Sequence, residues 1–402
     1  MTPEPDRIQV TSSTVSGPVV SVARTTDEVE ALRPLWSSLP VSNLDADIDY
    51  FLTVVEKHPS VISPYVLSVT PAGREPMLVV ARLEKHEFPV TAGYRTLLRL
   101  RLRTLVVSFD GIVGATTPED VATCIGAVHQ ALRRRDADAV AFQKLEQDGA
   151  LHEQVLASST KITRVRGLDS VTRWVADVPD SMEAFLARRS TSSRQRIRTD
   201  NRKLLKKYGE VRVERLHTGD LEFMLDELEK VSSKAYQRAL GVGGTNTALG
   251  RALISTCFEH RWLRAWMLYL DNEPVAFWLG SLHDGVFSID SPAFDPAYTK
   301  DSVGMYAMYA MVEDLCADPS VRVLDFGHGD AEYKRRWSNR TSVLRDETVV
   351  ASRPLPVLTA IVLSALYSAR GIAYRAARDT SFGRGLRRAW RSKLTAKNST
   401  AS

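Results

Sequence analysis

Hydrophobic and polar residues follow two patterns along this chain, and the patterns recur in a similar order in its two halves. Period-two alternation, as in Leu98-Arg-Leu-Arg-Leu102, is typical of half-buried strands, whereas apolar residues three and four apart, as in Pro118–Arg135, indicate amphipathic helices. Turn segments at residues 71–75 and 271–274 separate neighbouring strands and predict antiparallel hairpins. We therefore expect an α/β (α+β) protein with mixed, mostly antiparallel sheets flanked by helices.

The predicted elements of the first half are a strand, two helices, three strands, a helix, a strand and a helix. They are expected at Val19–Ala23, Thr26–Leu39, Asp47–Lys57, Tyr65–Thr70, Met77–Leu83, Leu97–Phe109, Pro118–Arg135, Ala139–Gln143 and Gly149–Ser158. The second half shows a similar order, at Val171–Val178, Ser181–Tyr208, Glu210–Leu216, Leu221–Arg238, Thr247–Trp262, Arg264–Leu270, Val275–Leu282, Gly285–Ile289, Val303–Cys316, Val321–Phe326 and Ser342–Val350. No repeat is visible residue by residue, so the duplication is inferred from element order.

This order divides the chain into four parts. Residues 1–17 are rich in Pro, Ser and Thr and are predicted to be disordered. Residues 18–160 and 165–350 form the two predicted halves, and residues 351–402 form a basic, amphipathic tail. The length of 402 residues agrees with two domains, since single cores rarely grow beyond about 250–300 residues. The hydrophobic content of 44% and the charged content of 25% are typical of a soluble globular protein.

The net charge of +5 is unevenly distributed along the chain. The tail holds ten Lys or Arg and one acid, Asp379, whereas the rest holds 43 basic and 47 acidic residues. The composition therefore does not favour nucleic-acid binding by the body of the protein. Leu355–Tyr367 is mostly apolar but too short to span a bilayer before Arg370. The tail is predicted either to lie on an anionic membrane surface or to dock a helix on the body and end in a disordered basic segment.

Cysteine spacing and the N-terminus indicate the cellular setting. Cys124, Cys257 and Cys316 lie far apart without metal-ligand spacing, so neither disulfides nor a metal site is expected. Met1–Arg7 lacks the basic start and apolar run of a signal peptide. We expect a cytoplasmic protein, with the tail offering a peripheral position on the inner face of the membrane.

The most distinctive chemistry follows the strand predicted at Val321–Phe326. Gly327 and Gly329 allow backbone angles closed to other residues, and Asp330 is placed to cap a helical turn that carries residues 333–337. A strand that ends on glycines and is followed by an aromatic residue and several cations suits an anionic ligand. The same pattern also describes an ordinary strand-to-helix turn with a solvated basic face.

Three motifs of the second half, taken together, carry a resemblance to a known family. They are Ser193-Arg194-Gln-Arg-Ile-Arg198, then Phe294-Asp295-Pro296-Ala-Tyr298 with Ser302-Val-Gly304, and Asp325-Phe-Gly-His-Gly-Asp330 with Tyr333, Lys334 and Trp337. In these motifs the chain resembles the GNAT acyltransferase superfamily, in its branch of cellulose- and exopolysaccharide-associated acetyltransferases. That branch is related to Fem-type peptidyltransferases, which have two GNAT-like halves. The resemblance covers about residues 165–345, is weaker over 19–160, and implies tandem GNAT-like halves here.

The resemblance implies a donor site between two adjacent parallel strands. In the GNAT fold these strands part, and acyl-CoA lies in the gap with its pyrophosphate on the following helix. That helix is expected to begin at Ser302, Val303, Gly304 and Met305, where free N–H groups and the helix dipole suit a phosphate. Asp301 or Ser302 would otherwise be only a helix cap. The GNAT signature Gln/Arg-x-x-Gly-x-Gly/Ala is not intact, and Fem-type relatives use aminoacyl-tRNA, so both donors stay open.

Four residues are predicted to catalyse acyl transfer to an amine or a hydroxyl. Asp290 and Asp325 end two strands and are candidate acid–base groups, although a turn-capping carboxylate is the alternative for each. Tyr333 would supply a proton to the leaving thiolate. Lys334 would neutralise charge at the thioester or on the substrate.

Substrate binding is predicted on the basic helix of the second half. Arg194 and Arg198 begin a cationic stripe of residues four apart. Arg194 adjoins the turn at residues 190–193 and is suited to hold an anionic group. Trp337 completes the predicted substrate contacts.

Together these features predict an acyl-CoA-dependent N-acyltransferase. The predicted acceptor is an amino sugar or another small-molecule or lipid-linked saccharide precursor of the cell envelope. One alternative is a Fem-like aminoacyl or peptidyl transferase that uses aminoacyl-tRNA. The other is a non-catalytic GNAT-like scaffold held at the membrane by its tail.

Overall fold

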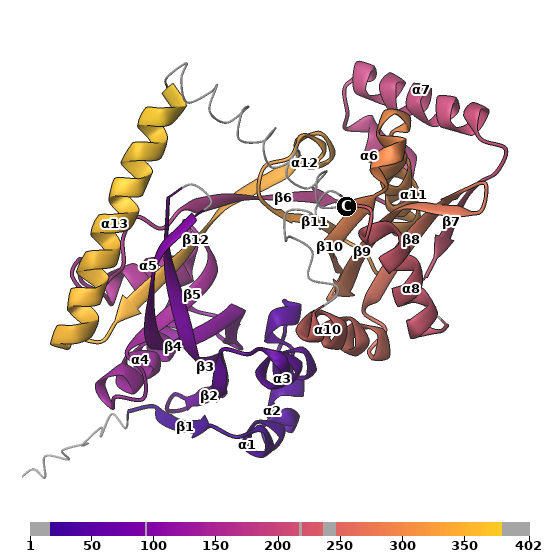
Figure 1. The fold of residues 1–402 in the computed structure, drawn as a ribbon. Helices are drawn as coiled ribbons and strands as arrows, with labels where there is room; N and C mark the ends of the chain where they lie inside the picture. The colour runs from indigo at the N-terminus through magenta and orange to yellow at the C-terminus, as the bar shows by residue number, and fades with distance from the viewer. Residues whose placement is uncertain (1–16, 93–94, 217–218, 236–246, 380–402) are drawn as a thin grey trace, which may run out of the picture.

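The computed structural model describes residues 17–92, 95–216, 219–235 and 247–379, and Figure 1 shows how their helices and strands are arranged. Residues 1–16, which belong to the segment predicted to be disordered, lie outside the described residues. The end of the tail, from residue 380, also lies outside them. The first half contains β1 (Val19–Ala23), α1 (Thr26–Glu30), α2 (Arg33–Ser38), η1 (Leu44–Ala46), α3 (Ile48–Lys57), β2 (Val61–Thr70), β3 (Met77–Ala92), β4 (Arg95–Val113), α4 (Pro118–Arg133), β5 (Ala139–Glu146) and α5 (Ala150–Ala157).

The second half begins with β6 (Ser170–Asp177), α6 (Met182–Ala187), α7 (Thr191–Lys207), β7 (Val211–Arg215), α8 (Leu221–Ser232), α10 (Ala248–Glu259), β8 (Leu263–Leu270) and β9 (Glu273–His283). It continues with β10 (Val286–Phe294), η3 (Pro296–Asp301), α11 (Val303–Ala317), β11 (Val323–His328), α12 (Glu332–Trp337), β12 (Arg340–Val350) and the long helix α13 (Pro354–Asp379).

All these strands join one twelve-stranded sheet, in the order β1-β2-β3-β4-β5-β12-β6-β11-β10-β9-β8-β7. In the first half β1 to β4 pair antiparallel in turn, and β5 joins β4 in parallel. In the second half β7 to β10 repeat this arrangement, and β11 joins β10 in parallel. The tandem arrangement of two GNAT-like halves expected from the sequence is therefore confirmed.

The two halves are joined through the strands that complete them. β12 comes from the end of the second half but pairs antiparallel with β5 of the first half. β6 pairs with β11, and β6 and β12 also pair with each other. The sheet consequently runs without interruption from one half into the other.

Helices cover both faces of each half of the sheet. On one face, α4 packs in the first half and α11 in the second; Met308 and Met311 of α11 lie against Phe287 and Leu324 in one hydrophobic cluster. On the other face, α1 to α3 pack in the first half, and α8 and α10 in the second. Both layers are needed because the central strands carry apolar side chains on both faces.

A second contact joins the halves on the opposite side from β6 and β12 (Figure 1). The α3 hydroxyl of Thr53 lies 2.8 Å from the hydroxyl of Thr256 in α10. Nε2 of His283, at the end of β9, lies 3.1 Å from the carbonyl oxygen of Val41. The two halves are therefore joined at two places, through the pairing of β5, β12 and β6 and through these contacts.

Two predicted helices are each divided in the structure. The helix expected at Thr26–Leu39 is α1 and α2, and Pro34 stands in the first turn of α2, where its missing N–H costs no hydrogen bond. The region expected at Ser181–Tyr208 is α6 and α7. Ser190 starts α7 because its hydroxyl accepts the N–H of Ser193 at 3.2 Å.

Candidate functional site

The parallel strands β10 and β11 pair over only three residues and then separate. Residues 286–288 pair with residues 323–325. Beyond this point β10 continues against β9 as far as Phe294, whereas β11 keeps its pairing with β6 on its other side. The parting of two adjacent parallel strands expected from the sequence is confirmed, and it begins after Ser288 and Asp325, two residues before Asp290.

Asp290 is the extra residue of a β-bulge in β10. Ile289 opposes Gly280 and Ser291 opposes Leu279, so Asp290 has no partner of its own in β9. A bulge redirects the side chain of its extra residue, and bulges are common beside active sites. The bulge therefore explains why Asp290 leaves the regular alternation of the strand.

The surroundings of the Asp290 carboxyl raise its pKa. Its side chain is exposed to solvent, but the protein around it reduces its hydration. This loss of hydration, with the negative charges of Asp45 and Asp325, raises the pKa of Asp290 to about 7. A hydrogen bond from the Ser281 hydroxyl, 3.3 Å from Oδ2, acts in the opposite direction. A group with a pKa near the working pH is well suited to general acid–base catalysis.

The first half brings further carboxylates to this place. Asp45 of η1 interacts electrostatically with Asp290, and Asp110 of β4 interacts with Asp45. Loss of hydration raises the pKa of Asp45 and of Asp110, while Arg82 and Arg173 respectively oppose these rises. We call Asp45, Asp110 and Asp290 the inter-half acidic cluster. Among the described residues no group of acids, His or Cys is arranged to hold a metal ion.

Asp325 is 7% exposed and fully engaged by its neighbours. Its Oδ2 accepts a hydrogen bond from Nε of Arg173 at 2.7 Å, and its Oδ1 accepts the N–H of Gly327 at 2.8 Å. These bonds fix the end of β11 and the turn that follows. The negative charge of Asp325 also raises the pKa of Asp290. The acid–base roles predicted for Asp290 and Asp325 stay predictions.

Tyr333 and Lys334 of α12 lie beside the parting of the strands. The Tyr333 ring packs edge-on against Trp278 and Phe326, with centroids 5.6 and 6.3 Å away, and burial raises its pKa to about 12. Nζ of Lys334 donates to the carbonyl oxygen of His328 at 2.8 Å. Partial burial lowers the pKa of Lys334, and the charge of Asp325 opposes this change.

Two residues of this segment differ from their predicted roles. Asp330 does not cap α12, which has Ala331 at its N-cap; Asp330 accepts a hydrogen bond from Nε of Arg335 at 2.7 Å instead. Trp337 is 2% exposed and packs against Phe185, with ring centroids 5.8 Å apart. Because its side chain belongs to the core, it supports α12 from behind and does not line a substrate site.

The first turn of α11 presents an open N-terminus. Ser302 has a left-handed conformation (φ +56°), and its side chain makes no cap hydrogen bond. The N–H groups of Met305 and Tyr306 both donate to the Ser302 carbonyl oxygen at 3.0 Å. Val303 and Gly304 precede these bonds, so their N–H groups are the ones available to a ligand. The amide of Met305, also predicted to bind the donor, is used within the helix.

The neighbourhood of this helix start is neutral or positive. Nε1 of Trp278 donates to the Gly304 carbonyl oxygen at 2.8 Å. Asp301 is not a cap, because its carboxylate is bound by Nζ of Lys207 and by the hydroxyl of Tyr208, both at 2.7 Å. The Lys207 hydrogen bond lowers the pKa of Asp301 and compensates its charge. An anion at the start of α11 is therefore not repelled by Asp301.

A second group of cations lines a cavity of about 530 Å³ at the start of α7. Its described lining consists of arginines and serines: Arg188, Arg189, Ser190, Ser192, Ser193, Arg196 and Arg336. Burial and the charge of Arg188 lower the pKa of Arg189. Of the predicted substrate residues, Arg194 donates to the Thr191 hydroxyl at 3.2 Å, and Arg198 is exposed on α7. The cations around this turn are thus not those that the sequence indicated.

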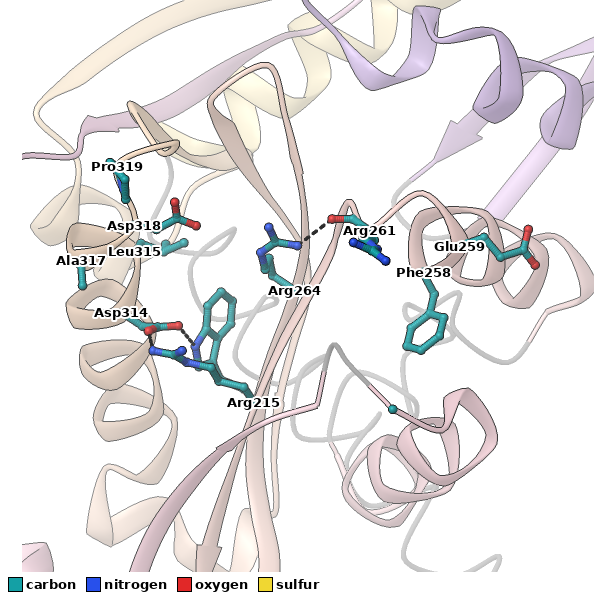
Figure 2. Close-up of a pocket in the computed structure, with 12 residues that line it drawn as sticks. Arg215, Phe258, Glu259, Arg261, Arg264, Asp314, Leu315, Ala317, Asp318 and Pro319 are labelled. Carbon is teal, nitrogen blue, oxygen red and sulfur yellow. Dashed lines mark hydrogen bonds and ion pairs between the residues drawn. The ribbon is translucent and has the colours of Figure 1, made fainter.

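A larger cavity, of about 800 Å³, lies at the other end of α11 (Figure 2). There, Asp314 is bound by Arg215 and by Nε1 of Trp266, the latter at 2.9 Å. Arg264 donates to the carbonyl oxygen of Arg261 at 2.7 Å. Since α11 has 15 residues, this cavity is about 22 Å from the open helix start. It is therefore not the donor site.

The sequence predicted the contribution of Asp290 from the second half to this site, but it did not predict the contributions of Asp45 and Asp110 from the first half. Asp45 and Asp110 follow no motif, because they lie in a short loop helix and in a strand irregularity. Only the packing of the two halves brings Asp45 to Asp290, and Asp110 interacts with Asp45. For the arginine cavity a signal was present, since Arg188 and Arg189 immediately precede the cap residue Ser190.

Comparison with known families identifies one domain. Residues 191–335 match the family model described as an acetyltransferase (GNAT) domain. The matched segment runs from α7 through most of α12 and so includes Asp290, the start of α11, Tyr333 and Lys334. A search of curated proteins found no match.

Solved structures share the fold over most of the chain. The crystal structure of FemX superposes with a TM-score of 0.58 at 12% identity, covering 85% of this chain and 100% of that chain. A protein of unknown function from Bacteroides thetaiotaomicron gives 0.51 at 13% identity, with 82% and 100% covered. The C-terminal domain of an Agrobacterium fabrum protein, described as a lysylphosphatidylglycerol synthetase, gives 0.50 at 12% identity, with 85% and 97% covered. At these identities the similarity shows the fold alone.

Proposed function

We propose that this chain, which belongs to the GNAT superfamily and shares the two-half fold of FemX, is an N-acyltransferase that uses acyl-CoA as its donor. The proposed acceptor is an amine on an amino sugar or on another small-molecule or lipid-linked precursor of the cell envelope. One observation carries the proposal: the open N-terminus of α11 lies where β10 and β11 part, and Asp290 stands in the same gap.

The donor would be held mainly by backbone groups. The N–H groups of Val303 and Gly304 and the positive end of the α11 dipole suit a pyrophosphate. A Cβ built on Gly304 would lie 3.5 Å from Cδ1 of Phe294, an ordinary contact. The protein itself thus has room for a methyl group there. The absence of a side chain at Gly304 would therefore serve to let a ligand approach the backbone of the first turn of α11 closely.

The inter-half acidic cluster supports an amine acceptor. Asp45, Asp110 and Asp290 would attract an ammonium group and disfavour acceptors that carry carboxylates or phosphates near the reacting atom. Because Asp45 and Asp110 come from the first half, both halves would contribute to acceptor binding.

In the proposed mechanism three side chains have separate tasks. The bound ammonium group first releases one proton to solvent and becomes the neutral amine. Asp290, in its carboxylate form, then takes a second proton from this nitrogen as it attacks the acyl carbonyl carbon. Lys334, half-buried beside the gap, stabilises the negative charge that develops on the carbonyl oxygen. Tyr333 donates a proton to the departing sulfur.

Calorimetric titration of acetyl-CoA into the intact protein tests the donor. We expect saturable binding in the range of about 1 μM–1 mM that is common for enzyme substrates, followed by acetylation of glucosamine-type amines detected by mass spectrometry. The matched variant Asp290→Asn should bind acetyl-CoA as the wild type does but form little product. No binding at millimolar acetyl-CoA would contradict the proposal.

Aminoacyl transfer from aminoacyl-tRNA is the second candidate. Two observations favour it: the fold similarity spans the full length of the FemX structure, and α7 presents a row of basic residues. Filter binding of aminoacyl-tRNA would then give an affinity that falls steeply with salt, because phosphate contacts release counterions. Binding of aminoacyl-tRNA without binding of acetyl-CoA would replace the first candidate by the second.

A further inference from the structure

One face of α13 is docked on the first half. Ala360, Leu363 and Tyr367 are buried in a hydrophobic cluster with Phe88 and Val350. Figure 1 shows the helix along the outer side of the first half, far from α7. The docked-helix alternative for the tail is therefore confirmed for this part of it.

The opposite face of α13 is apolar and exposed. Large hydrophobic side chains with 38–71% of their surface exposed lie on it: Leu355, Leu358, Ile361, Val362 and Ile372. Leu355, Leu358, Ile361 and Val362 lie three or four residues apart, except for the adjacent pair, and Ile372 follows Ile361 by eleven residues, about three helical turns. All five therefore fall along one stripe. Of the twelve exposed large hydrophobic residues in the part of the chain that the structure describes, these five are on this helix. Such clustering marks an interaction surface, whereas single exposed apolar residues are ordinary.

Charge identifies the kind of surface that this stripe fits. The sequence has no charged residue between Arg353 and Arg370, and residues 371–402 hold eight Lys or Arg and one acid. An apolar helix face with basic flanking residues complements a bilayer, whose acyl chains take the first and whose anionic headgroups attract the second. A second copy of this chain fits less well, because pairing through α13 would bring two strongly basic tails together.

We infer that α13 seats the protein on the surface of an anionic membrane, with its axis in the plane of the interface. Contrary to the prediction made from Leu355–Tyr367, the helical segment Pro354–Ile372, with a mean hydropathy of 1.5, is long and apolar enough to cross a bilayer by length and composition. However, Ala360, Leu363 and Tyr367 are held in the body, so the docked helix can offer only its outer stripe to lipid. This location goes beyond the proposed acyl transfer and does not depend on it.

Co-sedimentation of the full chain with vesicles tests the inference. Phosphatidylcholine vesicles with and without phosphatidylglycerol are compared for the wild type and for Leu358→Glu/Val362→Glu, which changes only exposed positions. We expect the variant to bind anionic vesicles at least about tenfold more weakly, because two charges enter the apolar stripe. The control Ile162→Glu/Phe223→Glu alters two residues that are exposed to a similar degree elsewhere, and it should bind as the wild type does. Equal binding of wild type and the α13 variant would overturn the inference.

Two further measurements separate membrane binding from misfolding and from self-association. Thermal unfolding should be the same for both double variants and the wild type, which distinguishes loss of the surface from loss of the fold. Replacing Arg387 and Arg388 by Gln should weaken binding to anionic vesicles by about fivefold per residue and leave binding to neutral vesicles unchanged. Light scattering without lipid should show no change of mass for the α13 variant. A wild-type dimer that Leu358→Glu/Val362→Glu converts to a monomer would assign the stripe to a second copy and overturn the membrane assignment.

Discussion

The two halves share one topology but differ at the N-terminus of the helix that connects the two parting strands, which is α4 in the first half and α11 in the second. In the first half, the α4 N-terminus is closed by its own side chains. The Thr117 hydroxyl accepts the N–H of Asp120 at 3.2 Å, and the Asp120 carboxylate accepts the N–H groups of Thr117 and Thr116 at 3.0 and 3.2 Å. Arg74 binds the same carboxylate at 2.6 Å. In the second half, the Ser302 side chain makes no such bond and the start of α11 stays open.

The strands that these helices connect, β4 and β5 in the first half and β10 and β11 in the second, are otherwise alike. β4 and β5 pair over residues 104–107 and then part, and β4 has an irregularity in which residues 108–111 face the single residue Val80. Asp110 lies in this irregularity, as Asp290 lies in the bulge of β10. Both halves therefore place a carboxylate at the same point of the fold, but only the second half leaves a helix N-terminus free for a phosphate. The two halves therefore differ in whether the first turn of this helix is closed by its own side chains or left open.

Replacing Asp290 and Asp110, which lie at equivalent positions of the two halves, should give the largest difference in activity between the halves. Asp290→Asn removes the proposed base, and we expect kcat to fall about 100- to 10,000-fold. Asp110→Asn removes only an attractive charge, so it should raise the acceptor KM and leave kcat within about threefold. Steady-state release of CoA thiol measures both. Equal losses of kcat would show that the halves do not differ in catalysis.

Closing the α11 N-terminus should give the next largest effect. Gly304→Asp places a carboxylate at the helix start, as Asp120 does in α4. Each hydrogen bond to a charged group that is lost costs about 1.5–3 kcal/mol, so acetyl-CoA should bind at least about tenfold more weakly. Gly304→Ala adds only a methyl group and should stay within about threefold. If calorimetry gives both variants the same affinity, the donor phosphates do not rest on α11.

The pH dependence of kcat/KM should be sensitive to the interaction between Asp45 of the first half and Asp290 of the second half. Asp290 must be ionised to accept a proton, so kcat/KM should rise with pH through about 7, where its pKa lies. Asp45→Asn removes a negative charge that raises this pKa, and the rise in kcat/KM should therefore move to lower pH. An unchanged profile in Asp45→Asn would mean that the first half does not act on the base.

The caps themselves should show the smallest effect. Thr117→Ala removes the α4 cap and should lower the free energy of unfolding by about 0.5–2 kcal/mol without changing kcat. Ser302→Ala removes a hydroxyl that makes no cap bond and should change stability by less than this. Denaturant unfolding of both variants measures the difference. A larger loss in Ser302→Ala would show that the α11 N-terminus is closed after all.

Sequence patterns predicted the features that depend on residues close together in the chain, namely the helices, the strands and some turns. Alternation and helical spacing placed nearly all strands and helices, and glycines with basic residues indicated the turn after β11. The start of α11 was predicted from the family resemblance, whose motif Ser302-Val-Gly304 lies within three consecutive residues. Motifs do not report burial, however, and Trp337 was therefore placed at the substrate although it lies in the core.

Contacts between distant segments could not be predicted in this way. Asp45 and Asp290 are separated by most of the chain, and their interaction depends on the α3–α10 contact and on the β6–β12 pairing. The pKa of Asp290 follows from this packing, since it arises from reduced hydration and from neighbouring charges. The sequence alone contains Asp290 but not the environment that would make it a base.

The position of β12 has a consequence for how this protein is made. Until residues 340–350 leave the ribosome, β5 has no neighbour on one side, and an unpaired edge strand is a site for aggregation. The first half can thus complete its sheet only after nearly the whole chain has been synthesised. Completion of the sheet therefore comes late and joins both halves in one step, and a chain truncated before β12 would be expected to depend on chaperones.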